Sequence, residues 1–422
     1  MKPVAASIQR RAGTLPAITS RTAPTGLALL LIVGVGIRLA VLGSVGHEWD
    51  VDSMAAWGEL MARVEPWRFY EHSRAMYPAL LYPLWALAEA LDGEALRVAV
   101  KALSIPFDAA LGVLLFAALR SAGPVPALGA AAVYLLNPAA IIGGAVWGQV
   151  DSARTLASLG SLVALGSRRH ATAGALSVVA GLLKPQFGLV TLVTVGVVVL
   201  GRKRNGTWRP LVRAVVGMAL AYAIIAGPLA LDPFRYLAVL GAAAESYPAT
   251  SLGAFNPWGL VVGMGVPDDP YIGLAAVLLL LGIGGALSGL RRPPDLAVVL
   301  GVGAVLALAF YFLPTRVHER HLFPALGLLA PFAVVSRAHL AAYVTISAGF
   351  AASLLYNLHV STDFTLPAFA AAVLVSPSGM WAIGLVLMAS AIAWSWMLVI
   401  RRPRLPSASV DSPARRLLPG RT

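Results

Sequence analysis

The feature that most constrains this chain is a series of uninterrupted apolar segments, each near the length of a membrane-spanning helix, that recurs along its 422 residues. A helix needs about 20 predominantly apolar residues to cross the hydrocarbon core of a bilayer. No water is available there to hydrogen-bond the backbone, so spanning segments must form helices or a closed barrel. The apolar residues do not alternate with polar ones, as barrel strands require. We therefore expect an all-α polytopic membrane protein.

The composition agrees with a lipid environment, because 58% of the residues are hydrophobic and 12% are charged, whereas soluble domains carry about 25% charged residues. The net charge of +13 comes from Lys and Arg in short loops and in the tails. That placement indicates membrane topology and argues against a nucleic-acid partner. The chain contains no cysteine, which excludes a disulfide, a thiolate nucleophile and a thiolate metal site.

The distribution of basic residues predicts the topology. Four Lys and Arg residues precede the first apolar run, so we expect residues 1–24 to be a disordered cytoplasmic tail, and residues 403–422 likewise. Residues 25–402 are expected to form one transmembrane domain of about twelve helices. The short, proline-containing segment 77–91 is expected to stay outside as a juxtamembrane helix, because a span there would move the later basic loops to the outer face.

The first outer loop contains two candidate general bases. Asp50 and Asp52 directly follow the expected end of the first helix, beside Trp49 and Trp57. Partial desolvation raises the pKa of a carboxylate and makes it a better proton acceptor. The alternative is that these acids are solvated charges at the interface, with the tryptophans in the aromatic belt.

Two further outer segments carry residue types that bind sugars and phosphates. Trp147, Gln149 and Asp151 fall within five positions and combine a stacking surface with hydrogen-bonding groups. Lys184 and Gln186 follow the expected fifth helix. An isolated lysine in an apolar region is costly and usually functional, although a lysine near the interface can also extend its amine to water.

The segment between the expected ninth and tenth helices is the most strongly charged candidate. Arg316, His318, Glu319 and Arg320 lie there with a second histidine. The two arginines could bind a phosphate bidentately, and His318 could donate a hydrogen bond or a proton to a phosphate or hydroxyl. The alternative is a solvated loop, although positive charge on the outer side runs against the topological bias.

Two weaker signals remain open. Asp108 lies in the middle of the expected second span, where a buried acid is by default a functional hypothesis; a structural ion pair with Lys101 is the alternative. Residues 251–258 end another outer loop, and they either line the same cavity or form an ordinary turn.

In this order, the motifs resemble the C-type (GT-C) membrane glycosyltransferases. Within them the chain is most similar to bacterial relatives of the second mannosyltransferase of GPI-anchor synthesis, and more distantly to the dolichol-dependent glucosyltransferases of N-glycan assembly. The matching pieces cover residues 47–358 and are Asp50 with Trp57, Tyr77-Pro78, Lys101 to Asp108, Asn137-Pro138, WGQVD at 147–151, Lys184-Pro185-Gln186, Phe255-Asn256-x-Trp258 and TRVHERHLFP at 315–324. Ala79 and His321 stand where the family usually has proline and tyrosine.

The resemblance implies a GT-C-like bundle in the bacterial plasma membrane and an inverting transfer at its extracytoplasmic face. The donor would be a polyprenyl-phosphate sugar, most often mannose, and the acceptor a glycan, lipid or protein. Asp50, or Asp52 in its place, would be the catalytic base. The donor phosphate would contact Arg316, Arg320, His318 and Lys184. The sugars or the acceptor would contact Trp147, Gln149, Asp151, Gln186, Asn256, Trp258 and Glu319.

A cofactor is not expected, although a loosely held divalent cation, Mg²⁺ or Mn²⁺, between Asp50 and Asp151 stays open. One alternative function is a membrane transporter or a flippase for lipid-linked sugars, since about twelve helices with both termini inside suit transporters. Another is a non-catalytic subunit of a glycan assembly complex. The halves of the chain show no repeat of the kind found in transporters. The polar residues also gather on one expected face and not at the midplane. Membrane lipid is a partner under either function.

Overall fold

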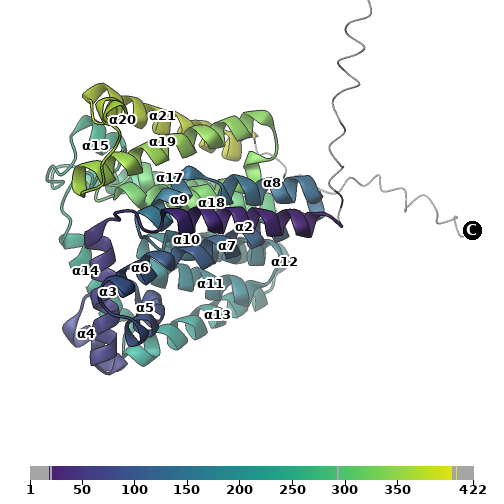
Figure 1. Cartoon of the computed structure of the whole chain (residues 1–422). Helices are drawn as coiled ribbons and strands as arrows, with labels where there is room; N and C mark the ends of the chain where they lie inside the picture. Colours follow the sequence, from purple (N-terminus) through teal and green to yellow (C-terminus); the bar gives the residue numbers. More distant parts are fainter. Residues whose placement is uncertain (1–18, 20, 292–293, 402–404, 406–422) are drawn as a thin grey trace, which may run out of the picture.

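The computed structural model describes residues 19, 21–291, 294–401 and 405, and in them the chain is helical, with isolated bridges in place of strands. The long helices run side by side, and short helices gather at one end (Figure 1). The predicted all-α class is confirmed for this part of the chain. The expected tails 1–24 and 403–422 lie outside the described residues, apart from positions 19, 21–24 and 405.

Six helices among the described residues are long and apolar enough to cross a membrane. They are α2 (Ala23–Val41), α6 to η2 (Gly93–Ala122), α13 with η5 (Arg209–Leu229), α16 with η6 (Ile272–Arg291), α19 (Arg337–Ser361) and α21 with η8 (Pro377–Arg401). Within the second of these, α6 is Gly93–Ala102, α7 is Ser104–Leu119 and η2 is Arg120–Ala122. A seventh would be a pair bent by 48°, α8 (Pro124–Leu135) followed by α9 (Pro138–Ile141) and η3 (Ile142–Val146).

The remaining expected spans are helices that are shorter than a bilayer is thick. They are α10 (Asp151–Gly166), α11 (His170–Leu183), α12 (Leu189–Asn205), α17 (Leu296–Phe312) and α18 (Phe323–Ala333). Every segment expected to span therefore contains a helix, but the expected count of about twelve spans is not confirmed. The shortest, α18, is buried along its entire length, so it belongs to the centre of the bundle.

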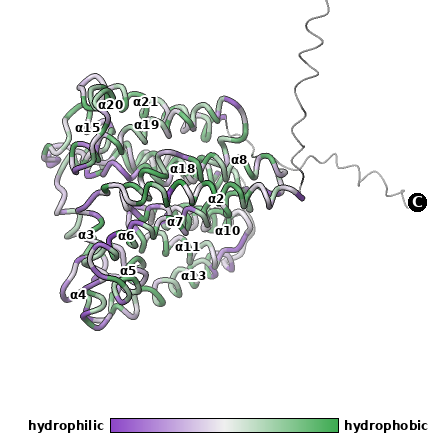
Figure 2. The backbone as a smooth tube through the Cα atoms, viewed as in Figure 1, coloured by the Kyte–Doolittle hydropathy of each residue, from purple (hydrophilic) through white to green (hydrophobic). Residues whose placement is uncertain are grey.

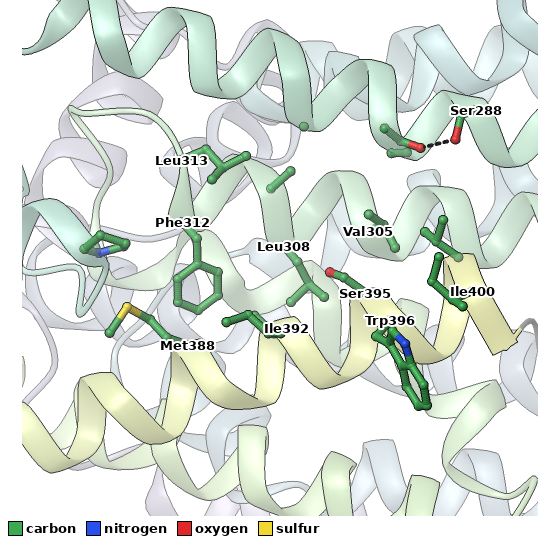
Figure 3. A pocket seen from close by; sticks show the side chains of 17 residues that line it. Ser288, Val305, Leu308, Phe312, Leu313, Met388, Ile392, Ser395, Trp396 and Ile400 are labelled. Atoms are coloured by element: carbon green, nitrogen blue, oxygen red, sulfur yellow. Dashed lines mark hydrogen bonds between the residues drawn. The ribbon is translucent and has the colours of Figure 1, made fainter.

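The outer helices expose many large apolar side chains, more than is usual on a surface that contacts water. Only 11% of the spanning stretch is buried in α2 and in α16, and residues such as Ile32, Leu280 and Leu281 are about two-thirds exposed. An apolar groove of about 650 Å³ lies among α16, α17 and α21, lined by residues such as Phe312, Met388 and Trp396 (Figure 3). Exposed apolar surface on this scale indicates contact with lipid.

Short helices occupy one end of the bundle. They include α3 (Glu48–Arg63), η1 (Pro66–Arg68), α4 (Phe69–His72), α5 (Pro78–Ala90), α14 (Pro233–Glu245), η4 (Pro185–Gly188), α15 (Pro257–Val261), η7 (Glu319–Leu322) and α20 (Ala368–Leu374). Hydrophilic stretches appear around α3 and α4 at this end (Figure 2). The helix expected over 77–91 forms as α5 and packs closely on α3, where a Cβ at Gly58 would lie 2.5 Å from the Leu84 carbonyl oxygen.

Candidate active site

The chain bends between α8 and α9, and the WGQVD turn that follows η3 lies against the start of α3. Asn137 caps α9 by accepting hydrogen bonds from two backbone amides, and Pro138 occupies the first helical position, a placement that suits proline. Gly148 follows with φ of +98°, a conformation that favours glycine. A Cβ there would lie 2.6 Å from the Val51 side chain. The turn therefore fits against α3 only because this residue is glycine.

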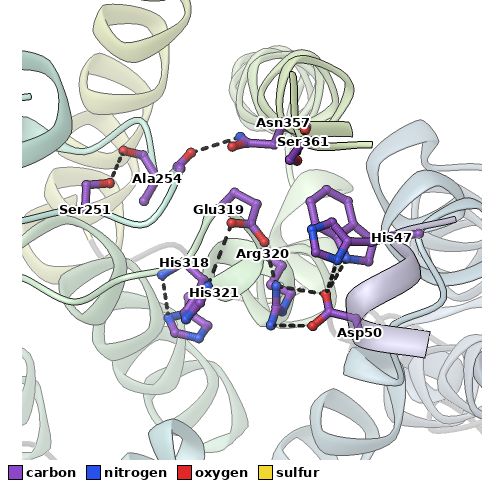
Figure 4. A network of polar contacts seen from close by, with 12 residues as sticks. His47, Asp50, Ser251, Ala254, His318, Glu319, Arg320, His321, Asn357 and Ser361 are labelled. Carbon is purple, nitrogen blue, oxygen red and sulfur yellow. Dashed lines mark hydrogen bonds and ion pairs between the residues drawn. The ribbon is translucent and has the colours of Figure 1, made fainter. Parts of the chain in front are cut away.

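The centre of the candidate site is the carboxylate of Asp50, whose side chain is 11% exposed (Figure 4). Trp147 Nε1 donates to Asp50 Oδ2 over 2.8 Å, and His47 Nδ1 lies 3.2 Å from the same oxygen. Arg320 Nη2 donates to Oδ1 over 3.1 Å, while its Nη1 lies 3.1 Å from Oδ2. The rings of His47 and Trp147 stack in parallel with centroids 4.8 Å apart. Donors from three separate elements thus converge on one carboxylate.

These contacts decide the protonation of Asp50. Burial alone would raise the pKa of Asp50, but the Arg320 guanidinium and the hydrogen bonds from His47 and Trp147 outweigh it, so the pKa lies well below its ordinary range. Asp50 is therefore ionised at neutral pH. Both of its oxygens face positive or N–H groups, and a carboxylate held in this way is a weak proton acceptor until one of those groups moves away.

Arg320 also binds the neighbouring acid of its own segment. Its Nη1 donates to Glu319 Oε1 over 2.7 Å, so one guanidinium joins two carboxylates. Burial raises the pKa of Glu319, although Arg320 opposes this. The loop 249–254 supports this arrangement, because Leu252 accepts from the Glu319 amide and Asn357 Nδ2 donates to the Gly253 carbonyl over 2.9 Å. Gly253 has φ of +81°.

A second buried charged group lies next to the first. Asp151 Oδ1 accepts from Lys184 Nζ over 2.9 Å, and Asp151 Oδ2 lies 3.0 Å from Arg154 Nη2; all three side chains are at most 3% exposed. Arg154 also donates to the backbone carbonyl of Arg320. Burial and the nearby Arg154 lower the pKa of Lys184 to about 7, although Asp151 opposes them. The lysine expected at this site is therefore buried and paired and does not extend to water.

The two histidines of the charged segment pack on each other. Their ring centroids are 5.3 Å apart, and His321 Nδ1 accepts from the His318 backbone amide over 3.2 Å. His321 Nε2 lies 3.3 Å from Gln186 Nε2. Burial and neighbouring cations lower the pKa of both His318 and His321 well below the ordinary value, so both rings are neutral at pH 7. Gln149 is buried in the turn between Trp147 and Asp151.

Two of the expected residues lie in separate ion pairs. Asp52 comes two positions after Asp50 on α3, so its side chain points to another face, where it lies 3.2 Å from Arg97 and is 54% exposed. Arg316 makes a bidentate pair with Asp268, at 2.8 and 3.0 Å. Asp50 and Arg320 thus pair with each other, whereas Asp52 pairs with Arg97 and Arg316 pairs with Asp268. The roles of these two carboxylates in catalysis and of these two arginines in phosphate binding stay predictions.

Asn256 and Trp258, expected to contact a sugar, hold the junction between α15 and α17. Asn256 caps α15 by accepting from the Gly259 amide, and its Nδ2 donates to the Tyr311 carbonyl. Trp258 Nε1 donates to the Leu313 carbonyl over 2.8 Å. Their polar atoms are thus bonded to backbone groups, and sugar binding by either residue is untested.

Several contributing residues were not expected. His47 precedes the acidic cluster without a recognisable motif, and Arg154 follows Asp151 at i+3, a helical spacing that could have revealed the pair. The partner of Asp108 is Arg38, not Lys101: the Arg38 Nε lies 2.9 Å from Asp108 Oδ2, both side chains are 1% exposed, and Tyr134 donates to Oδ1. Lys101 instead donates to the Ser44 carbonyl. The charge of Arg38 inside the first apolar run was the available signal.

The described residues contain no group of three or more His, Asp or Glu side chains arranged to hold a metal ion. Asp50 and Asp151, between which a divalent ion was considered, are each paired with cationic side chains. The expectation that no cofactor is required, and the alternative of a divalent ion at this position, both stay untested. No protein-family model and no curated protein sequence matches the chain. The assignment of function thus depends on the geometry of the site and on the motifs that resemble the GT-C enzymes.

Proposed function

We propose that the protein is an inverting glycosyltransferase that uses a polyprenyl-phosphate sugar, most often mannose, and acts at the extracytoplasmic face of a bacterial plasma membrane. In this proposal the short central helices complete a GT-C-like bundle of about twelve helices. The observation that carries the proposal is that Trp147 and Arg320, from two distant segments, both contact the Asp50 carboxylate at one end of the bundle. Their contact brings a candidate base beside a candidate anion-binding group.

To act as a general base, Asp50 must lose its contact with Arg320. A phosphodiester of the donor competes with Asp50 for the Arg320 guanidinium, because guanidinium binds phosphate and carboxylate with the same bidentate geometry. Loss of that contact raises the pKa of Asp50, because Arg320 is the strongest of the influences that lower it. Donor binding would in this way convert a weakly basic carboxylate into a competent general base.

In the transfer step, Asp50 takes the proton of an acceptor hydroxyl while that oxygen attacks the anomeric carbon. The bond between the anomeric carbon and the phosphate oxygen breaks, and the electron pair leaves with the polyprenyl phosphate. This leaving group gains one negative charge, which fixed cations stabilise most strongly in a site that excludes water. Arg320 is placed to do this directly, and the buried Lys184 and Arg154 add positive potential next to it.

The test of this proposal is release of polyprenyl phosphate from a panel of polyprenyl-phosphate sugars by purified protein in detergent, where transport across a membrane is undefined. Release of the lipid phosphate with one sugar of the panel supports the enzyme. The anomeric configuration of the product, opposite to that of the donor, supports inversion. A protein that is inert in detergent, but that moves a lipid-linked sugar between leaflets after reconstitution, is a flippase and contradicts the proposal.

A further inference from the structure

A cavity of about 560 Å³, lined mostly by polar residues, lies beside His47 and the residues that flank Asp50 in the sequence. It is formed between the start of α3 and the end of α19, and its lining includes His47, Glu48, Trp49, Asp52, Ser361 and Thr362. His47 connects the cavity to the candidate site, because its Nδ1 lies 3.2 Å from Asp50 Oδ2. Figure 4 shows His47 pointing to Asp50, with Ser361 on a neighbouring helix. A ligand in the cavity could therefore present a group to the base.

The charge of the cavity favours an uncharged occupant over an anionic one. Glu48 and Asp52 are both exposed and both line it, whereas none of the described lining residues is Lys or Arg. A phosphate here would be repelled by the carboxylates of Glu48 and Asp52, although Asp52 is paired with Arg97 over 3.2 Å. The positive groups Arg320, Lys184 and Arg154 do not line this cavity. The donor phosphate and the occupant of this cavity thus approach from regions of opposite charge.

The hydrogen-bonding groups of the cavity select a ligand that supplies donors. Carboxylates accept hydrogen bonds only. The Ser361 and Thr362 hydroxyls donate to carbonyls of their own helix, which leaves their oxygens as acceptors. A sugar chain, rich in hydroxyl donors, matches such a lining, and Trp49, which is 74% exposed, offers an aromatic face against which the C–H groups of a sugar ring can pack.

We propose that this cavity is the acceptor site and that the acceptor is an uncharged, hydroxyl-rich glycan. The inference rests on the proposed function, since it assigns the second substrate of the same centre. The glycan packs on Trp49, its hydroxyls donate to Glu48 and Asp52, and the hydroxyl to be glycosylated passes His47 to reach Asp50.

Binding can be measured without turnover. The purified protein in lipid nanodiscs, which avoid detergents with sugar head groups, is titrated with neutral mannotriose and with mannose 6-phosphate. We expect mannotriose to bind more tightly. Trp49→Ala should weaken its binding about tenfold, the scale of a lost aromatic contact, and Asp52→Lys should weaken it while strengthening mannose 6-phosphate. The matched control is Trp67→Ala, since Trp67 is also an exposed indole, at 58%, but lies in η1 and outside the cavity lining.

Three results would overturn the acceptor site: Trp49→Ala binding mannotriose as wild type does, wild type preferring the phosphorylated sugar, or no binding of mannotriose at all. Transfer of donor sugar to water by the wild-type protein, measured in parallel, reports the enzyme separately. If donor turnover is present and Trp49 has no effect, the enzyme stands and the cavity assignment is wrong. If mannotriose binds through Trp49 but the donor is never cleaved, the cavity is a glycan site and the proposed function is wrong.

Discussion

Replacement of Arg320 by methionine tests whether this one cation balances two buried acids. The change removes the guanidinium from Asp50 and Glu319 while keeping an apolar side chain of similar length. At about 4 Å, opposite charges at an effective dielectric constant of about 20 attract with about 4 kcal/mol, which corresponds to about three pH units in the pKa of Asp50. Removal of one partner of a buried ion pair typically costs about 3–5 kcal/mol of stability.

The loss should depend on pH in a defined direction. In the wild type, the pKa of Asp50 is held below its unfolded value, so its stabilising contribution is complete above about pH 5 and is lost only as pH falls towards the native pKa. Without Arg320, the pKa of Asp50 rises towards its unfolded value, and the already raised pKa of Glu319 rises further. Stability is then lost as pH rises through the raised pKa of Glu319. The variant should therefore be closest to wild type near pH 5 and most destabilised near pH 8.

The assay is the apparent melting temperature of wild type and Arg320→Met in nanodiscs across this pH range, read by tryptophan fluorescence. Arg97→Met is the matched control, because the Arg97–Asp52 pair also involves α3 but has side chains 37% and 54% exposed, and exposed pairs contribute about 0–1 kcal/mol. A loss in Arg320→Met that is independent of pH, or no greater than that in Arg97→Met, would refute the reasoning about buried charge compensation.

Three further outcomes are expected. Gly253→Ala should lower both stability and donor turnover, because the new Cβ would lie 2.2 Å from Asn357 Oδ1 at a residue with φ of +81°. The control is Gly284→Ala, which has open space around its Cβ. Equal melting temperatures of the two variants would contradict this packing. Arg38→Met should cost about 3–5 kcal/mol by leaving Asp108 unpaired, and adding Asp108→Asn should recover much of it, which thermal melting can check. Donor turnover should survive EDTA; loss that Mn²⁺ restores would instead establish a metal site.

The sequence was sufficient to predict the helical class and to single out residues that the structure brings together. Charged residues in an apolar chain are few, so Asp50, Asp151, Lys184 and Arg320 stand out, and the structure places them in two neighbouring groups. The number of spans could not be obtained in the same way. A buried helix such as α18 is apolar because it packs against protein on all sides, and composition alone does not separate it from a lipid-exposed span.

The roles of paired residues also needed three-dimensional information. Asp50 and Asp52 are the same residue type two positions apart, so the sequence does not distinguish them. The turn of α3 directs Asp50 towards Arg320 and Asp52 towards Arg97. The partner of Asp108 lies 70 positions away on α2, a contact that depends on how the helices pack. The short spacing in the sequence suggests Lys101 as the partner of Asp108, but it does not indicate Arg38.

The most direct test of the central claim is donor turnover by Asp50→Asn, compared with Glu59→Gln and Asp52→Asn. Glu59 is a matched control, because it is a carboxylate on the same helix that pairs with Arg63 at the surface. With polyprenyl-phosphate mannose, or whichever donor the wild type cleaves, Asp50→Asn should lose at least about a hundredfold in kcat, the scale of a missing general base, while Glu59→Gln keeps wild-type rates. Wild-type turnover by Asp50→Asn, or a comparable loss only in Asp52→Asn, would contradict the assignment of Asp50 as the base.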